Sequence, residues 1–149
     1  MPRPAGPKGA KSAALSLRLT PRTRYGLTLL ARVNRLSLGQ VVEEALENAF
    51  YGEGPGTLER RLGSGTKRVR VLDVTWDERP WVRLGKLALL GPELLTSPEL
   101  RLWESLRDIP SYWRGGRAAH RAEDLDNAML HTDIERDWPE LSRAAEVGI

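Results

Sequence analysis

Hydrophobic and polar residues alternate strictly over a short stretch near the start of the chain. The alternating residues are Leu15, Ser16, Leu17, Arg18 and Leu19. In a β-strand this order puts the three leucines on one face and the two polar side chains on the other. A single strand leaves its edges unpaired, so we expect this one to pair with the same strand of a second chain.

Two segments of helical spacing follow. Thr20 and Pro21 suit the N-cap and the first turn of one helix. Ser37 and Gln40 have the spacing of a capping box at the start of a second helix. About 40 residues are too few to bury a core alone, so we expect folding and dimerisation to be one event. The residues expected in the shared dimer core are Leu15, Leu17, Leu19, Leu27, Leu30, Val41, Val42, Ala45 and Leu46.

The polar face of the expected ribbon carries side chains that can read DNA. A two-stranded ribbon is narrow enough for the major groove, where an arginine can donate two hydrogen bonds to guanine. Ser16 and Arg18 would therefore face base edges. The N-terminus of the second helix, at Ser37, Leu38 and Gly39, offers free backbone N–H groups and a positive dipole end, which can hold a phosphate.

The order of these motifs resembles the ribbon–helix–helix family of DNA-binding proteins, the Arc and MetJ type. The motifs are LSLRL, the L-x-x-L-A core of the first helix, and the R-L-S-L-G-Q-V-V-x-x-A-L turn and second helix. The resemblance covers about residues 14–52 and implies an intertwined homodimer with an antiparallel ribbon in the major groove. It also implies base contacts by Ala14, Ser16 and Arg18, and a phosphate contact by Ser37, Leu38 and Gly39.

The sequence departs from the family's pattern at two positions. Glycine is common in the family at the turn that Arg35 occupies here. Asn34, the residue before it, can adopt the left-handed conformation, so the turn remains feasible. A second hydroxyl residue is usual where Gly39 lies, so its side-chain contact with phosphate would be missing.

Positive charge is concentrated at the N-terminal end of the chain. Residues 1–42 contain eight Lys or Arg and no Asp or Glu, whereas residues 51–149 contain 15 basic and 17 acidic residues. Such a local excess is the electrostatic footprint of a nucleic-acid-binding segment. The cations expected to contact phosphate are Arg22 and Arg24 of the first helix and Lys8 and Lys11 ahead of the strand.

Composition divides the chain into four segments. Residues 1–13, rich in Pro, Gly and Ala, should form a disordered basic arm that either contacts DNA or only aids solubility. Residues 14–51 form the expected ribbon–helix–helix segment. Residues 52–66 form a glycine-rich linker, in which TLERRL is compatible with a helical fragment. Arg60 and Arg61 could reach phosphates from this linker, although a solvated surface is the simpler interpretation.

Residues 67–149 should form a small, mostly helical α+β domain whose role the sequence does not indicate. All five tryptophans lie there, whereas disordered tails are poor in aromatic residues. KRVRVLDVTW is typical of a strand. The expected helices end at Gly91, run from Ser97 to Pro110, span residues 117–130 and begin at Pro139. The chain as a whole is therefore predicted to be mainly α with a short β-strand.

No residue pattern indicates catalysis. The chain lacks cysteine and has no glycine-rich phosphate loop of the Walker or dinucleotide type. His120 and Asp124 could share a helical face and hold a metal, but a surface histidine beside a carboxylate is the simpler interpretation. We therefore expect no enzyme, metal or cofactor. No apolar run is long enough for a membrane span or a signal peptide, so we expect a cytoplasmic protein without a membrane partner.

Several functions fit these expectations. The first is a transcriptional repressor or autoregulator that binds double-stranded DNA as a homodimer or a higher oligomer, with a C-terminal domain that meets an effector or a protein partner. The second is an antitoxin whose C-terminal part wraps a toxin. The third is an accessory DNA-binding protein of plasmid transfer or partition. The fourth does not involve DNA: the chain would be a protein-interaction module, and residues 14–50 would serve only as its dimerisation element. We favour the repressor because its mechanism requires no residue or partner protein beyond those that the sequence indicates.

Overall fold

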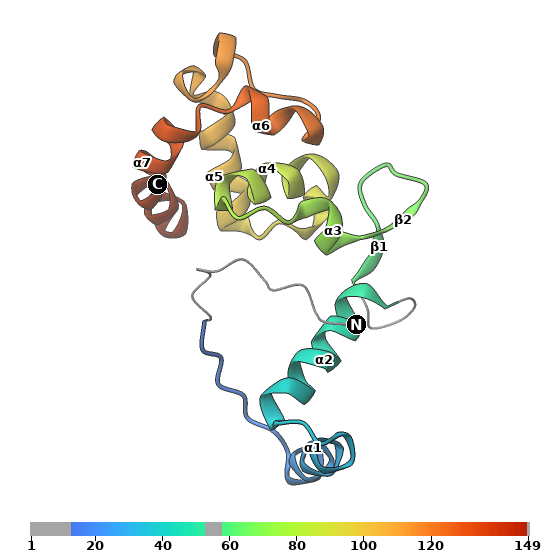
Figure 1. Cartoon of the computed structure of the whole chain (residues 1–149). Helices are drawn as coiled ribbons and strands as arrows, with labels where there is room; N and C mark the ends of the chain where they lie inside the picture. The colour runs from blue at the N-terminus through green and yellow to red at the C-terminus, as the bar shows by residue number, and fades with distance from the viewer. Residues whose placement is uncertain (1–12, 53–57, 149) are drawn as a thin grey trace. The chain divides into compact units, whose positions relative to one another are not determined.

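The computed structural model of the chain describes residues 13–52 and 58–148 (Figure 1). Its described residues are mostly helical, with a single two-stranded antiparallel sheet among them. This confirms the expected class, mainly α with a short β component. The chain divides into two compact units, Met1–Ala45 and Leu46–Ile149. The division falls inside the second helix.

Both N-terminal helices begin at the caps that the sequence predicts. Helix α1 spans Pro21–Asn34, and the Thr20 hydroxyl accepts a hydrogen bond from the Thr23 N–H at 3.3 Å. Helix α2 spans Leu38–Tyr51. Ahead of it, the Gln40 N–H donates to Ser37 Oγ at 3.1 Å, and the Ser37 N–H donates to Gln40 Oε1 at 2.9 Å. The reciprocal pair is the predicted capping box.

The turn between α1 and α2 places Arg35, and not Asn34, in the left-handed conformation. Arg35 has φ 54° and ψ 42°, and the Leu36 N–H donates to Ala31 O at 2.9 Å. Asn34 remains helical, and its Nδ2 donates to Leu30 O at 3.0 Å. The turn that the sequence left feasible therefore forms, but its left-handed residue is Arg35 and not Asn34.

Replacing Arg35 with glycine is expected to stabilise the first unit by about 0.5–1 kcal/mol, because glycine adopts the left-handed conformation without the Cβ penalty. Thermal unfolding at fixed protein concentration, followed by circular dichroism, measures the gain. Tryptophan fluorescence reports the second unit separately, since every tryptophan lies there. Arg35→Ala removes the same charge but keeps the Cβ. A glycine variant no more stable than this control would contradict a strained turn.

Residues 13–20 have no regular secondary structure in the single chain. A strand is stabilised by hydrogen bonds to a neighbouring strand, and no described residue supplies them here. The expected strand over the alternating leucines therefore depends on a second chain and remains a prediction.

The two strands that do form lie farther along the chain. Strand β1, Glu59–Arg61, pairs antiparallel with strand β2, Arg68–Arg70. Gly63 has φ 55°, which allows the chain to reverse between them. The helical fragment expected for TLERRL is therefore wrong, because this turn directs its backbone hydrogen bonds across a hairpin. The strand expected from KRVRVLDVTW is confirmed only in its first part, because helix α3 begins at Val71.

Helices form the rest of the second unit. The α-helices are α3 Val71–Thr75, α4 Pro80–Leu90, α5 Ser97–Asp108, α6 Leu125–Ala128 and α7 His131–Val147. The short 3-10 helices are η1 Pro92–Leu94, η2 Pro110–Tyr112, η3 Arg114–Gly116 and η4 Ala122–Asp124. The predicted ends of α4 and α5 are confirmed. In α5, Thr96 and Glu99 complete a capping box just ahead of the predicted start.

Two helices expected near the C-terminus differ from the structure. Residues 117–130 are not one helix; they divide into an irregular stretch, η4 and α6. The final helix begins at His131, and Pro139 lies inside it. One face of α7, including Ile134 and Ala145, is buried against the core. The free energy gained by this burial offsets the loss of the backbone hydrogen bond that Pro139 cannot donate.

The second unit has a core of its own. Its most deeply buried side chains are Trp113, Leu106, Leu125, Met129, Ile134 and Val82. Trp113 Nε1 donates to Leu106 O at 2.9 Å, so the buried indole N–H is satisfied. Gly85 permits a close approach, since a Cβ there would lie 2.9 Å from Leu125 Cδ1. The core therefore needs no partner chain to exclude water.

A polar cluster closes one side of this core. The Arg79 guanidinium donates to both carboxylate oxygens of Asp77, at 2.9 and 3.1 Å, and to Asp126 Oδ1 at 2.6 Å. Trp81 Nε1 donates to His131 Nδ1 at 3.0 Å. The side-chain hydrogen bonds from Arg79 lower the pKa of Asp77 from 3.8 to about 2, against the raising effect of burial.

The Asp77 carboxylate is expected to make the stability of the second unit depend on acid pH. Its folded pKa lies below the unfolded value, so its contribution is complete above about pH 4 and is lost as pH falls toward 2. The shift corresponds to about 2 kcal/mol. Asp77→Asn should therefore lower the free energy of unfolding by about that amount at pH 7, and by progressively less below pH 4. Urea unfolding followed by tryptophan fluorescence measures both, and a pH-independent difference would contradict this role.

Candidate nucleic-acid interface

The leucines of the alternating segment are exposed in the single chain. The exposed fractions are 77% for Leu15, 57% for Leu17 and 40% for Leu19. Three exposed aliphatic side chains within five residues put apolar surface in water, and an accumulation of such surface is typical of an interaction site. The segment is therefore one that a partner surface would stabilise.

The two N-terminal helices add to this unburied apolar surface. Of the residues expected in the dimer core, Val41 is buried and Leu27 and Val42 are half-buried, while the others are exposed. Leu30 and Leu46 are the largest exposed members on the helices. Within the first unit, the buried side chains that the structure describes are Ala31 and Val41. A single copy of this unit therefore buries too little surface to explain its own folding.

Side chains suited to base contact lie on the same segment. Ala14, Ser16 and Arg18 are all exposed. In a strand they would share the face opposite the leucines. Their accessibility satisfies one requirement for base contact, and their arrangement in a paired ribbon remains a prediction.

Groups that can hold phosphate lie at the starts of the two helices. Arg22 and Arg24 are exposed in the first turns of α1. At the start of α2, the described residues offer no acceptor to the N–H groups of Leu38 and Gly39. The nearest atom to a Cβ built on Gly39 is Ser37 Oγ at 3.9 Å, so no side chain crowds the Cβ position of this residue. The geometry permits an anion to approach the positive end of α2.

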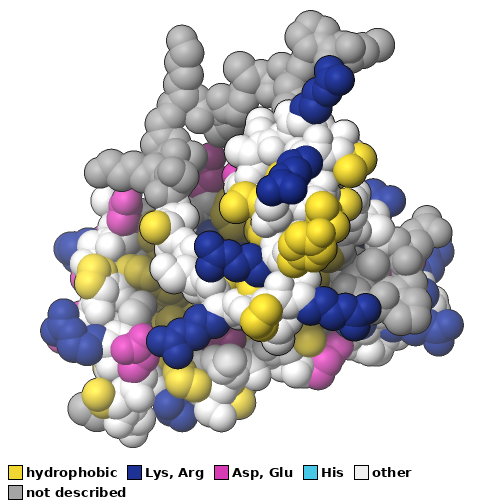
Figure 2. Space-filling model, turned by 90° about the horizontal axis from the view of Figure 1, so that it is seen from below, with side chains coloured by type: hydrophobic (Ala, Val, Ile, Leu, Met, Phe, Trp, Pro, Cys, Tyr) yellow, Lys and Arg dark blue, Asp and Glu magenta, His cyan; other side chains and the backbone are white. Residues whose placement is uncertain are grey.

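Figure 2 shows basic and hydrophobic side chains intermixed on the face of the molecule that includes α1. Residues 1–42 contain no acidic side chain, because the first one in the sequence is Glu43. The remaining expected phosphate contacts, Lys8 and Lys11, belong to the arm and lie outside the described residues. The candidate interface is therefore residues 14–20 with the first turns of α1 and α2.

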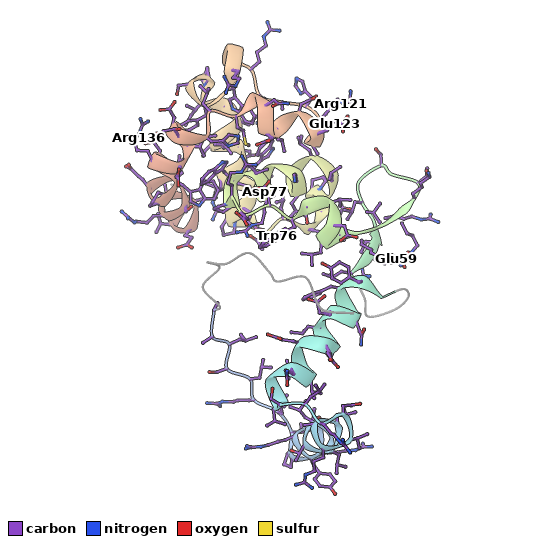
Figure 3. The ribbon with its side chains drawn as sticks, viewed as in Figure 1. Glu59, Trp76, Asp77, Arg121, Glu123 and Arg136 are labelled. Atoms are coloured by element: carbon purple, nitrogen blue, oxygen red, sulfur yellow. The ribbon has the colours of Figure 1, made fainter. Side chains whose placement is uncertain are left out.

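The second unit contains a shallow apolar hollow on its surface. A hollow of about 380 Å³ is lined mainly by hydrophobic side chains, with Trp76 and Trp138 among them. Trp76 is 55% exposed, and the guanidinium carbon of Arg83 lies 4.8 Å from its ring centre (Figure 3). The sequence did not single out this hollow, because its lining comes from four helices, α3, α4, α5 and α7, whose packing the hydrophobic pattern does not specify.

The histidines do not assemble a metal site in the described part of the chain. His120 lies in an irregular stretch and not on a helix, so it does not share a helical face with Asp124 as the sequence suggested. The neighbouring Arg121 forms an ion pair with Glu123 (Figure 3). Among residues 13–52 and 58–148, no group of three or more metal-ligating side chains comes together. None of the helices described there is both long and apolar enough to cross a membrane.

No family model, curated protein or solved structure matches this chain. Its function must therefore be inferred from its own residues and their placement.

Proposed function

We propose that the chain is a sequence-specific DNA-binding protein that acts as a homodimer, most simply as a transcriptional repressor or autoregulator. The observation that carries this proposal is the exposure of Leu15, Leu17 and Leu19, which alternate in the sequence with the exposed Ser16 and Arg18. Pairing this segment with a second copy would bury the leucines and turn both arginines outward. The proposed activity is binding alone, without a metal or cofactor.

The ribbon would read DNA from the major groove. Arg18 suits guanine, because its guanidinium can donate to O6 and N7 together, and Ser16 can donate or accept at a neighbouring base. The α2 N-terminus, with Arg22 and Arg24, would hold phosphates and set the register of the ribbon. Two-fold symmetry predicts a palindromic or repeated site.

The folded second unit favours a repressor over an antitoxin. An antitoxin segment that wraps its toxin is expected to be disordered when alone, and such segments bury little apolar surface. Residues 46–148 instead enclose a tryptophan-rich core without a partner. We assign this unit to oligomerisation, or to the recognition of an effector or protein partner.

A duplex titration tests the proposal. Full-length protein is titrated into the duplex from upstream of its own coding region, and into a scrambled duplex of the same length, over a range of salt. Tight binding to the first duplex that weakens steeply with salt is the expected result. No binding to either duplex at low salt would refute DNA binding and leave residues 14–50 as a dimerisation element.

A further inference from the structure

The hairpin formed by β1 and β2 is the most basic part of the second unit. Residues 58–70 contain five Lys or Arg and one acidic residue, a net charge of +4. Residues 71–149 contain ten basic and fifteen acidic residues, a net charge of −5. The cations are Arg60, Arg61, Lys67, Arg68 and Arg70, and all five are exposed. The hairpin therefore has a net positive charge, whereas residues 71–149 have a net negative charge.

The register of the hairpin brings one pair of like charges together. Arg61 lies directly opposite Arg68, whereas Glu59 lies opposite Arg70. Facing side chains of like charge destabilise a two-stranded ladder. Glu59, which pairs with Arg68 at 3.6 Å, is labelled in Figure 3. Within the described residues, no carboxylate forms an ion pair with Arg61, Lys67 or Arg70.

The hairpin is fixed to the helical part of the unit by its turn. Leu62 is buried, and its side chain fills the space where Gly91 lacks a Cβ. The Gly63 N–H donates to Glu93 Oε1 at 2.9 Å, and a Cβ on Gly63 would come within 2.8 Å of Leu90 O. In Figure 1, β1 and β2 lie beside α3 at the edge of this unit. The arginines therefore extend from an anchored support.

We propose that this basic hairpin is a second nucleic-acid contact, which binds the phosphate backbone of duplex DNA without reading bases. It deepens the proposed function, on which it rests. Guanidinium groups match phosphate oxygens in geometry as well as charge. Same-face arginines two residues apart on a strand are about 6.6 Å apart. Along a hairpin of this length, about 10 Å, duplex DNA presents about six charges.

Other anionic surfaces fit the hairpin less well. Elements that bind membrane surfaces insert apolar side chains beside their cations. Here the nearby apolar residues Leu62 and Val69 are buried and half-buried, so the exposed residues of the strands are charged. The other basic segment of the chain, residues 1–42, is the proposed DNA reader. One duplex DNA could therefore bind both basic regions, residues 1–42 and the hairpin.

The test compares two variants of the full-length protein with equal net charge. The first carries Arg61→Gln, Lys67→Gln and Arg70→Gln, which leave the Arg68–Glu59 pair intact. The second, a matched control, carries Arg107→Gln, Arg121→Gln and Arg143→Gln, three exposed positions outside the hairpin. Both variants and the wild type are titrated against the upstream duplex and the scrambled duplex, between about 50 and 200 mM salt. A single-stranded RNA and vesicles of phosphatidylcholine and phosphatidylserine in equal parts are titrated in the same way.

The hairpin variant is expected to bind both duplexes about tenfold more weakly at the lowest salt, with the preference between them unchanged. Its slope of log affinity against log salt should fall by about 2 to 3 per protomer, because each lost phosphate contact contributes about 0.9. The control should keep the wild-type slope. The hairpin variant should also unfold at about the wild-type temperature, since Arg61→Gln relieves the repulsion between the facing Arg61 and Arg68 while Arg70→Gln removes a cation opposite Glu59.

Each other outcome overturns the inference in a recognisable way. Wild-type binding with the same salt slope in both variants removes the hairpin from the interface and leaves the proposed function intact. Failure of wild type to bind any duplex removes the proposed function and the hairpin contact together. If the hairpin variant loses binding only to single-stranded RNA, or only to vesicles of phosphatidylcholine and phosphatidylserine in equal parts, the hairpin recognises a different polyanion.

Discussion

Replacing Leu17 with aspartate is expected to convert the full-length protein from a dimer to a monomer and to remove much of the helicity of α1 and α2. In the proposed ribbon, Leu17 is the central apolar side chain, and in the single chain it is 57% exposed. Each protomer would bury an unpaired carboxylate, which costs about 3–5 kcal/mol, and the dimer contains two of them. The dissociation constant should therefore rise by about four orders of magnitude or more.

Sedimentation equilibrium over a range of concentration measures this change, and circular dichroism reports the accompanying loss of helix. Ser16→Asp adds the same charge one residue away, on the opposite face of the expected strand, and should leave the dimer intact. Tryptophan fluorescence should remain native in both variants, because the second unit has its own core. Equal dimerisation of the Leu17 and Ser16 variants would exclude the proposed ribbon.

The elements that the sequence predicted well are those with local start and stop signals. Thr20 with Pro21, and Ser37 with Gln40, define the beginnings of α1 and α2 through hydrogen bonds over three residues. The α5 helix is equally local, with its capping box at Thr96. Such caps involve only neighbouring residues, so tertiary packing rarely changes them.

The elements that the sequence mispredicted depend on contacts between distant parts of the chain. The β1–β2 hairpin requires Gly63 to fit against Leu90, which lies 27 positions farther on. Helix α7 continues through Pro139 because one of its faces is buried in the core. Neither contact appears as a periodicity in the local sequence. Tertiary packing therefore overrode two local preferences: the tendency of proline to begin or break a helix, and the helical propensity of the TLERRL segment.

The sequence could predict which residues belong to the candidate site, but not how they are arranged in space. Alternation identified Ser16 and Arg18, and the structure places both in solvent. The basic hairpin was harder to find, because Arg60 and Arg61 looked like ordinary linker cations until pairing placed Arg61 opposite Arg68. A charge count restricted to residues 58–70 would have indicated it.

The proposed preference for one DNA sequence is expected to disappear in Arg18→Ala, while the proposed dimer remains folded. A bidentate contact between arginine and guanine discriminates by about 1–3 kcal/mol. A symmetric dimer makes it twice, so affinity for the preferred duplex should fall by between about 30-fold and 10⁴-fold. Affinity for a scrambled duplex should fall far less, because only a general positive charge is lost there. Titration of both duplexes at one salt concentration measures the ratio.

Arg22→Ala separates base recognition from simple charge loss. It removes one exposed cation from the first turn of α1, close in sequence to Arg18 but off the expected strand. As a phosphate contact, it should weaken binding to both duplexes by the same factor and leave their ratio unchanged. If Arg18→Ala behaves in the same way, Arg18 contacts the backbone and another element must read the bases. A selective loss in Arg18→Ala alone would assign recognition to the ribbon, because its alternation sets Arg18 on the face opposite the leucines.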